Sequence, residues 1–235
     1  MGEPPVLTID GPSGAGKGTV SRAIAKRLGW HFLDSGAIYR ALALSVLERK
    51  VPPQDEEAVA KAAQEMALEF SSGDSGQILL AGRDVTARLA TEECGRLASK
   101  IAAFPKVRQA LLAKQRSFRQ APGLVADGRD MGTVVFRDAP YKVFLTAALR
   151  ERARRRLLQL QAQGLDVTLD QIIKDLEERD RRDRERKEAP LVPAQDAVVI
   201  DSTELSVEEV IARILRLLPP DIGNKVLPVL AGSGG

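Results

Sequence analysis

The amino-acid sequence predicts an α/β protein, in which a five-stranded parallel sheet is flanked by helices. Short apolar runs rich in β-branched residues recur along the chain and are typical of buried strands. They cover residues 6–9, 30–33, 124–126, 142–145 and 198–200. Most stretches between them carry apolar residues at helical spacing, and this alternation of strand and helix is typical of a parallel sheet.

Helices are predicted from the same apolar spacing. The first follows a glycine-rich segment and covers residues 19–28. Ser35 is expected to cap the next one, in which Ile38, Leu42 and Val46 share a face. Further helices are predicted over residues 55–70, 91–103, 105–119, 149–163, 169–187 and 207–217.

The chain is predicted to consist of a core, an insertion and a tail. The core comprises residues 5–50 and 90–218, with a helical lid at about residues 154–186. Residues 51–89 interrupt the strand–helix alternation and are expected to form an inserted lobe. Two prolines and a glycine-rich end predict a poorly ordered tail over residues 219–235.

Inside the insertion, the composition changes twice. The polar, glycine-containing stretch 71–76 is predicted to be a loop. Residues 77–85 then read as two short antiparallel strands joined by a tight turn at Ala81-Gly82. We found no internal repeat of 20 to 50 residues in the sequence.

Composition excludes several classes of protein. Of the 235 residues, 44% are hydrophobic and 29% charged, which argues against a disordered chain. No run reaches the roughly 18 apolar residues of a membrane helix, and the N-terminus does not resemble a signal peptide. One histidine and one cysteine cannot form a Cys/His zinc site. The single Cys94 fits a reducing compartment, so we expect a cytoplasmic protein.

The charges favour a small phosphorylated ligand over nucleic acid. With 35 basic and 32 acidic side chains, the net charge is only +3, and aromatic residues make up only 4%. A nucleic-acid-binding protein would instead show a basic stripe with interleaved aromatics. Many of the basic residues are arginines in the second half of the chain, and arginine suits bidentate recognition of anions. We expect no nucleic-acid or membrane partner, and a monomer.

Residues 11–17, Gly-Pro-Ser-Gly-Ala-Gly-Lys, fit the phosphate-loop pattern G-x-x-x-x-G-K. Glycines let successive backbone amides turn inward around phosphate oxygens, and the following helix directs its N-terminus at the same anion. The lysine adds a mobile positive charge. An ordinary glycine-rich turn would not require this lysine between a strand and a helix. ATP is therefore expected to be bound by Gly11, Pro12, Ser13, Gly14, Ala15, Gly16, Lys17, Gly18 and Thr19.

One position departs from the usual phosphate-loop sequence. Gly18 occupies the place of the Ser or Thr that normally ligates Mg²⁺ directly after the lysine. We therefore expect no direct protein ligand for Mg²⁺, and an outer-shell role for Thr19 or for the strand-end residue Asp127. Mg²⁺ would arrive with ATP.

Three further clusters of residues are candidates for binding an anion. Two are expected at the carboxyl ends of strands, where ligands bind in open α/β sheets, and this common location favours binding over a plain helix cap or a salt bridge in a turn. The third lies on one face of a helix and could also be a solvated helix face. The first comprises Ser35 and Arg40, and the second Arg129 and Asp130. The third, at helical spacing i, i+4, i+7, comprises Arg179, Asp183 and Arg186. On the preceding helix, further phosphate-facing arginines are expected from among Arg152, Arg154, Arg155 and Arg156.

These residues together resemble the bacterial-type cytidylate kinase, or (d)CMP kinase, family. The likeness extends from Ile9 to about Leu217. It is carried by the phosphate loop, by Leu-Asp-Ser-Gly-Ala-Ile-Tyr-Arg at 33–40 and by Ala-Asp-Gly-Arg-Asp-Met-Gly-Thr at 126–133. The resemblance implies a P-loop NTPase fold with a monophosphate-binding insertion and a short lid. It also implies transfer of the ATP γ-phosphoryl group to CMP or dCMP.

The resemblance also assigns the acceptor site residue by residue. The acceptor phosphate would be held by Ser35, Arg40, Arg129 and Arg186. Cytosine would be recognised by Ser99, Arg108 and Asp130. The sugar would contact Arg179 and Asp183. The catalytic residues would be Lys17, Arg129 and Arg186. Because the acceptor phosphate is already ionised near pH 7, no general base is expected.

Two other readings remain open at this point. One is a phosphate-loop kinase for another small acceptor, such as shikimate or a coenzyme precursor. The other is a nucleotide-dependent regulator that binds ATP without fast turnover and uses its arginines to contact a protein partner.

Overall fold

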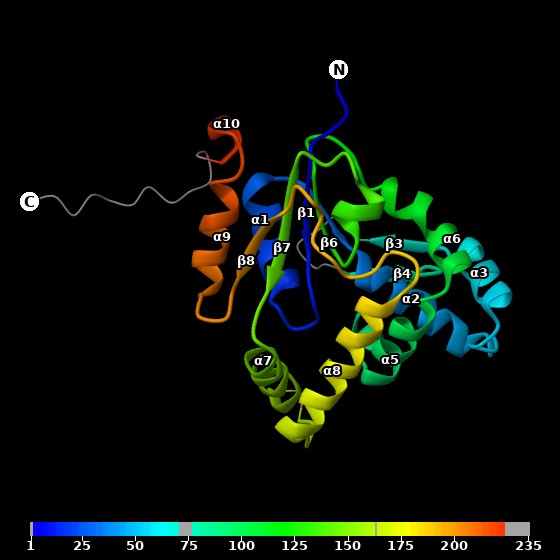
Figure 1. The fold of residues 1–235 in the computed structure, drawn as a ribbon. Helices are drawn as coiled ribbons and strands as arrows, with labels where there is room; N and C mark the ends of the chain where they lie inside the picture. The colour runs from blue at the N-terminus through cyan, green and yellow to red at the C-terminus, as the bar shows by residue number, and fades with distance from the viewer. Residues whose placement is uncertain (1, 71–76, 163, 224–235) are drawn as a thin grey trace, which may run out of the picture.

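The structure, a computed structural model, describes residues 2–70, 77–162 and 164–223. Its centre is a parallel sheet with the strand order β2-β6-β1-β7-β8 (Figure 1). The strands are β1 (Val6–Asp10), β2 (His31–Asp34), β6 (Leu124–Gly128), β7 (Tyr141–Thr146) and β8 (Val198–Asp201). The predicted five-stranded parallel sheet is confirmed.

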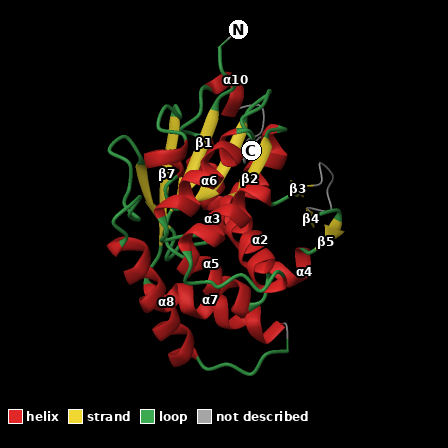
Figure 2. Cartoon of the chain, turned by 90° about the vertical axis from the view of Figure 1, so that its right-hand side faces the viewer, coloured by secondary structure: helices red, strands yellow, loops and turns green. Residues whose placement is uncertain are grey.

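Helices cover both faces of this sheet (Figures 1 and 2). On one face, α1 (Lys17–Leu28) and α9 (Val207–Leu215) pack against Ile9, Leu145 and their neighbours. The opposite face is covered by α2 (Ser35–Glu48), α5 (Glu92–Ile101) and α6 (Pro105–Arg116). Strand β1 is paired on both sides, so it is buried along its whole length, as its apolar sequence predicts.

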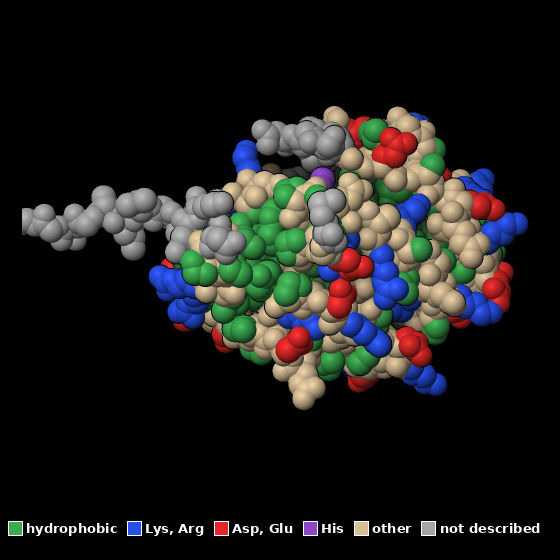
Figure 3. Space-filling model, turned by 90° about the horizontal axis from the view of Figure 1, so that it is seen from above, with side chains coloured by type: hydrophobic (Ala, Val, Ile, Leu, Met, Phe, Trp, Pro, Cys, Tyr) green, Lys and Arg blue, Asp and Glu red, His purple; other side chains and the backbone are tan. Residues whose placement is uncertain are grey.

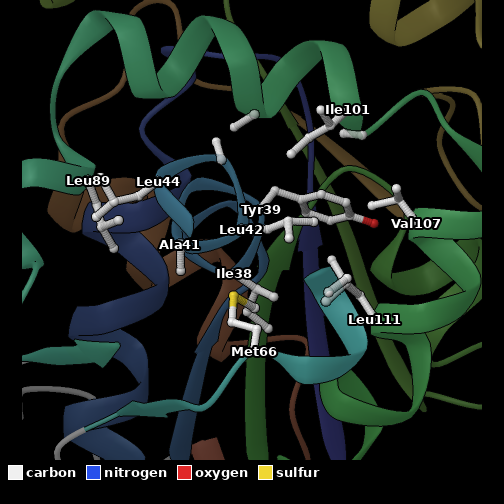
Figure 4. Close-up of a cluster of buried hydrophobic side chains, with 14 of the residues drawn as sticks. Ile38, Tyr39, Ala41, Leu42, Leu44, Met66, Leu89, Ile101, Val107 and Leu111 are labelled. Carbon is white, nitrogen blue, oxygen red and sulfur yellow. The ribbon is translucent and has the colours of Figure 1, made fainter. Parts of the chain in front are cut away.

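Tyr39 of α2 belongs to the hydrophobic cluster on this second face. Figure 4 shows its ring among the side chains of Leu42, Ile101 and Val107. Only 7% of Tyr39 is exposed, and the Arg108 guanidinium lies 5.9 Å from the ring centre. Tyr39 is therefore a core residue with a guanidinium over the face of its ring.

The insertion contains α3 (Glu56–Glu65), α4 (Thr86–Leu89) and a small sheet of β3 (Leu68–Phe70), β4 (Ile78–Leu80) and β5 (Arg83–Asp84). The antiparallel pair predicted at residues 77–85 is confirmed as β4 and β5. The helix predicted over 55–70 is wrong at its end. It stops at Glu65, because Leu68–Phe70 pair with β4 and Phe70 packs edge-on against Phe118. The loop predicted over 71–76 lies outside the described residues.

Two antiparallel helices, α7 (Leu149–Ala162) and α8 (Leu169–Glu185), project beyond the carboxyl end of the sheet (Figure 1). They share a small hydrophobic cluster of their own, formed by Ala153, Leu160, Ile172 and Leu176. Both helices were predicted at nearly these bounds. Their position over the carboxyl ends of the strands is where a lid would cover ligands.

The remaining elements are short. A π-helix, η1 (Met131–Val135), follows β6, and α10 (Pro220–Gly223) lies in the segment predicted to be a poorly ordered tail. Residues 224–235 of that segment lie outside the described residues. Among the described residues, no helix has the length and apolar character needed to cross a membrane. The face opposite the lid helices mixes acidic, basic and hydrophobic side chains (Figure 3).

Gly11, directly after β1, is required by a close approach to β7. A Cβ atom at this position would lie 1.9 Å from the carbonyl oxygen of Leu145, so the chain could accommodate it only by moving backbone. Gly29 has a positive φ of 65°, but a Cβ atom there would meet nothing within 4 Å.

Gly11→Ala is therefore expected to lower the free energy of unfolding by about 3 kcal/mol, the upper part of the range for overpacking. The control Gly29→Ala should cost only about 1 kcal/mol, the steric cost of a left-handed residue. Urea unfolding followed by circular dichroism measures both. Equal losses in the two variants would contradict the contact with Leu145.

Candidate active site

The loop between β1 and α1 ends at Lys17. Gly14 and Gly16 have φ angles of 79° and 90°, a left-handed conformation that glycine adopts without steric cost. Gly16 is the N-cap of α1, whose first backbone N–H groups have no partner within the helix. Lys17 is 6% exposed, and its ammonium donates to the carbonyl of Pro12 (2.8 Å). Loop amides, helix N-terminus and lysine together suit an anion.

The surroundings of Lys17 disfavour its positive charge. Burial, together with the nearby guanidiniums of Arg129 and Arg179, lowers the pKa of Lys17 to about 7, although Asp127 opposes the shift. Burial also raises the pKa of the Asp127 carboxyl to about 7, against the effect of Lys17. An added anion next to Lys17 would stabilise the charged ammonium and raise its pKa.

A cavity of about 540 Å³ opens over this loop. We call it the loop cavity. Its lining includes residues 13–19 and, from α7, Arg155 and Arg156. Three apolar residues in or just before α9 also line it: Leu205, Val207 and Val210. Arg155 donates to the carbonyl of Ser202 (2.7 Å), which fixes α7 against the segment after β8. The cavity therefore joins an anion site to an apolar wall.

A second cavity, of about 200 Å³, lies on the other side of Lys17. We call it the arginine cavity. All nine residues assigned to the acceptor by resemblance line it: Ser35, Arg40, Ser99, Arg108, Arg129, Asp130, Arg179, Asp183 and Arg186. They come from α2, α5, α6, the segment after β6, and α8 with its C-terminal end. The two cavities meet, because Ser13, Lys17 and Arg129 line both.

Some arginines of this cavity are paired. Arg108 forms an ion pair with Asp130, and these side chains are only 11% and 4% exposed. Arg129 Nε lies 2.9 Å from Asp183 Oδ2. Burial works against an ionised Asp183, but Arg129, Arg186 and Arg179 outweigh it and lower the pKa of this carboxyl. These pairs hold buried charges that would otherwise be costly.

Other donors of the cavity are left open. Arg179 Nε and Arg186 Nη2 are buried, and neither has a hydrogen-bond partner among the described residues. Burial, with Arg129 next in importance, lowers the pKa of Arg179 to about 10, and burial also lowers the pKa of Arg186. Buried N–H groups without acceptors are unfavourable, so these two guanidiniums are arranged to receive an anionic ligand.

The start of α2 differs from the prediction. Asp34, not Ser35, caps the helix: Asp34 Oδ1 accepts from the backbone N–H of Ala37 (2.9 Å). As the last residue of β2, Asp34 has the non-helical backbone that an N-cap needs. Ser35 is the first helical residue and is free to line the arginine cavity.

From the sequence we expected phosphate-facing arginines among the four in α7. Two of the four line the loop cavity, and the other two have different roles. Arg152 is buried and structural: it pairs with Asp180 of α8 (2.7 Å) and donates to the carbonyl of Ser13 (3.0 Å). Arg154 is exposed and forms an ion pair with Glu151 (3.7 Å) on the same helix. Arg155 and Arg156 do line the loop cavity. The sequence could not separate these roles, because all four arginines lie within two turns of one helix.

The lid also touches α5 across the arginine cavity. Arg156 forms an ion pair with Glu92, and Arg182 of α8 donates to the Ser99 hydroxyl (3.2 Å). Arg182 was not singled out from the sequence. None of the described residues in the insertion lines the cavity, but the carbonyl of Leu89 accepts from Arg40 Nη1 (2.6 Å). The insertion therefore acts on this site by orienting Arg40.

Comparison with known proteins identifies the family. Residues 7–219 match the family model described as cytidylate kinase. The chain belongs to the cytidylate kinase family. It is therefore a nucleoside monophosphate kinase, which is a phosphotransferase.

Individual relatives agree with this family. A cytidylate kinase from Methylococcus capsulatus is 65% identical over 91% of this chain and 96% of its own length. One from Klebsiella pneumoniae is 55% identical over 90% and 94%. Among solved structures, a gluconokinase from Sinorhizobium meliloti aligns over 95% of this chain and 97% of its own, at 16% identity and a TM-score of 0.46.

The low pKa of Lys17 predicts that the protein takes up protons when it binds ATP near pH 8. With a pKa of about 7, Lys17 is mostly neutral there in the ligand-free protein, and the phosphates raise this pKa. Calorimetric titration in two buffers of different ionisation enthalpy measures the uptake, to which Lys17 contributes at most about one proton. Because bound phosphates also raise the pKa of the neighbouring Asp127 carboxyl, the uptake should fall, but not vanish, in Lys17→Met. It should be unchanged in Lys61→Met, which changes an exposed lysine. Buffer-independent heats in the unmodified protein would contradict the low pKa.

Proposed function

We propose that this chain transfers the γ-phosphoryl group of ATP to CMP or dCMP, with ATP in the loop cavity and the acceptor in the arginine cavity. The observation that carries the proposal is the wall of Ser13, Lys17 and Arg129 that the two cavities share. Two nucleotides in these cavities would meet with their phosphates beside Lys17, which is the geometry that direct transfer between them requires.

Residues of the phosphate loop would hold the donor. Residues 13–19 line the loop cavity, while Gly11 and Pro12 shape the turn through the Leu145 contact and the bond to Lys17. Arg155 and Arg156 add positive charge from the lid, and the apolar wall offers a surface for the adenine ring. This division of polar and apolar lining supports ATP as the donor.

The acceptor phosphate would be held by Ser35, Arg40, Arg129 and Arg186. The unpartnered Arg186 Nη2 supports this, because a phosphate oxygen would satisfy it. Arg179 and Asp183 would contact the sugar. Arg129 lines both cavities, so it can neutralise charge on the phosphoryl group as it passes from donor to acceptor. Such neutralisation of the equatorial oxygens is the main contribution of the protein in phosphoryl transfer.

Cytosine would be recognised by Ser99, Arg108 and Asp130. The base offers an N4 amino donor beside the N3 and O2 acceptors. A buried carboxylate, a guanidinium and a hydroxyl provide the complementary set. The Arg108–Asp130 pair supports this role, because each side chain holds the other in place and both are largely buried.

Mg²⁺ is expected to enter with ATP. No cluster of three or more acidic, histidine or cysteine side chains suited to a metal occurs among the described residues. The isolated oxygens of Asp127 and Thr19 fit an outer-shell role, since Mg²⁺ commonly keeps several waters and binds mainly through substrate phosphates. Bound there, Mg²⁺ would neutralise charge on the transferring phosphates. Asp127 is buried beside Gly18, and Thr19 is exposed at the loop cavity.

The chain itself would align the two nucleotides and neutralise their charge, and no residue is needed as a general base. Residues 51–89 would form an inserted lobe of the monophosphate-binding region that acts through Arg40, and residues at about 154–186 would form the lid. The working unit would be a monomer. With ATP and CMP or dCMP as substrates, we place the enzyme in the cytoplasm.

The acceptor panel tests the proposed function. In a coupled assay with CMP, dCMP, UMP and AMP, CMP or dCMP should have the highest kcat/KM. UMP should be at least about 10²-fold poorer, because its O4 acceptor would face the Asp130 carboxylate. AMP should be poorer still, because adenine is a larger, two-ring base and does not offer the O2 acceptor of cytosine. Comparable turnover of AMP, or none of CMP, would refute the assignment.

Lys17→Ala should lower kcat by about 10² to 10³, the scale of losing one charge-stabilising donor. The KM for CMP should change little, because Lys17 is assigned to the transferring phosphates. Lys61→Ala, an exposed lysine of α3, is the matched control and should keep full activity. A loss of tenfold or less in Lys17→Ala would argue against this role.

A further inference from the structure

Asp10 is a buried carboxylate close enough to Lys17 and Asp130 to interact with them electrostatically, but it lines neither cavity. It is the last residue of β1, and its backbone pairs with Gly128 on β6 and Phe144 on β7. Only 5% of it is exposed. The phosphate loop begins at the next residue, so Asp10 lies at the junction between the central strand and the proposed donor site.

The two oxygens of Asp10 bind the segment that follows β6. Oδ1 accepts from the backbone N–H of Met131 and Oδ2 from that of Gly132, each at 2.8 Å. These are the first residues of η1, directly after Arg129 and Asp130. Arg129 and Asp130 thus lie within three positions of the backbone N–H groups that Asp10 binds.

The packing around this contact leaves little freedom. A Cβ atom on Gly132 would lie 2.9 Å from Thr8 Oγ1 and 3.4 Å from Asp10 Oδ2, so η1 rests directly on β1. Burial raises the pKa of Asp10 to about 6, while the two N–H groups oppose the shift. The carboxyl is therefore ionised near pH 7.5, and hydrogen bonds to an ionised acceptor are the strong ones.

We propose that Asp10 is a positioning residue for the transfer reaction: through Met131 and Gly132 it fixes Arg129 and Asp130 in the arginine cavity relative to the phosphate loop. This rests on the proposed function, which assigns Arg129 to the acceptor phosphate and Asp130 to the base. Asp10 would touch neither nucleotide. It fixes the position of the acceptor-binding residues relative to β1, the strand that precedes the phosphate loop.

Graded substitutions test the assignment. Asp10→Asn keeps one acceptor oxygen and presents an amide to the other N–H, whereas Asp10→Ala leaves both N–H groups without an acceptor. We expect kcat/KM for CMP to fall about tenfold in the first and about 10²-fold in the second, the scale of a misplaced binding group. The KM for ATP should stay within about threefold in both, because the loop itself is unchanged.

The matched control is Thr8→Val. Thr8 lies on the same strand with its side chain against Gly132, is fully buried, and its hydroxyl has no hydrogen-bond partner among the described residues. It should leave the KM for both substrates within about twofold. Assays are run below the thermal transition of each variant; if Asp10→Ala does not fold, Asp10→Asn carries the test. An equal rise of both KM values, or an unchanged kcat/KM for CMP, would overturn the proposal.

Arg129→Ala in the same assay separates this inference from the function on which it rests. If CMP kinetics were unchanged in Arg129→Ala, the acceptor site itself would be wrong. If Arg129→Ala lost CMP use and Asp10→Asn did not, only the role of Asp10 would fall. In the double variant, Asp10→Asn should cost less than it does in the unmodified protein, because the residue through which it acts is gone. Additive losses would contradict action through Arg129.

Discussion

Burial of positive charge at the carboxyl edge of the sheet is the constraint on which the site depends. Lys17, Arg129, Arg179 and Arg186 converge there, partly compensated by Asp127, Asp130 and Asp183. Burial lowers the pKa of Lys17, Arg179 and Arg186. Such an arrangement is unfavourable in the empty protein and becomes favourable when phosphate arrives. The ligand-free protein is therefore less stable than it would be without these buried charges, and binding of the substrates stabilises it. The surrounding fold is the frame that holds these charged groups away from solvent.

Much of that frame could be predicted from the sequence, because each parallel strand is a short apolar run between helices and two of them end in Asp-Gly. The failures have local causes. Leu68–Phe70 continue an apolar pattern compatible with a helix, and only their pairing with β4 makes them a strand. Asp34 and Ser35 are both good caps by type, and the end of β2 decides between them.

The members of the candidate site were predictable, but their connections were not. Motifs and resemblance named nine of the residues that line the arginine cavity. The Arg108–Asp130 and Arg129–Asp183 pairs join residues 22 and 54 positions apart, and the contacts of Asp10 span more than 120. No local pattern encodes such distances; they follow from strand order and from the placement of the lid. Likewise, the sequence does not distinguish Arg152 from Arg155. In the fold, Arg152 pairs with Asp180 and links the two lid helices, whereas Arg155 lines the loop cavity.

Tyr39 belongs to two environments at once. Its ring packs with Leu42 and Ile101 in the interior, and the same residue lines the arginine cavity. With the acceptor in that cavity, as we propose, a smaller side chain at position 39 would make more room for a base but would also leave a void in the hydrophobic layer behind it. Acceptor preference and stability would then both depend on this one aromatic side chain.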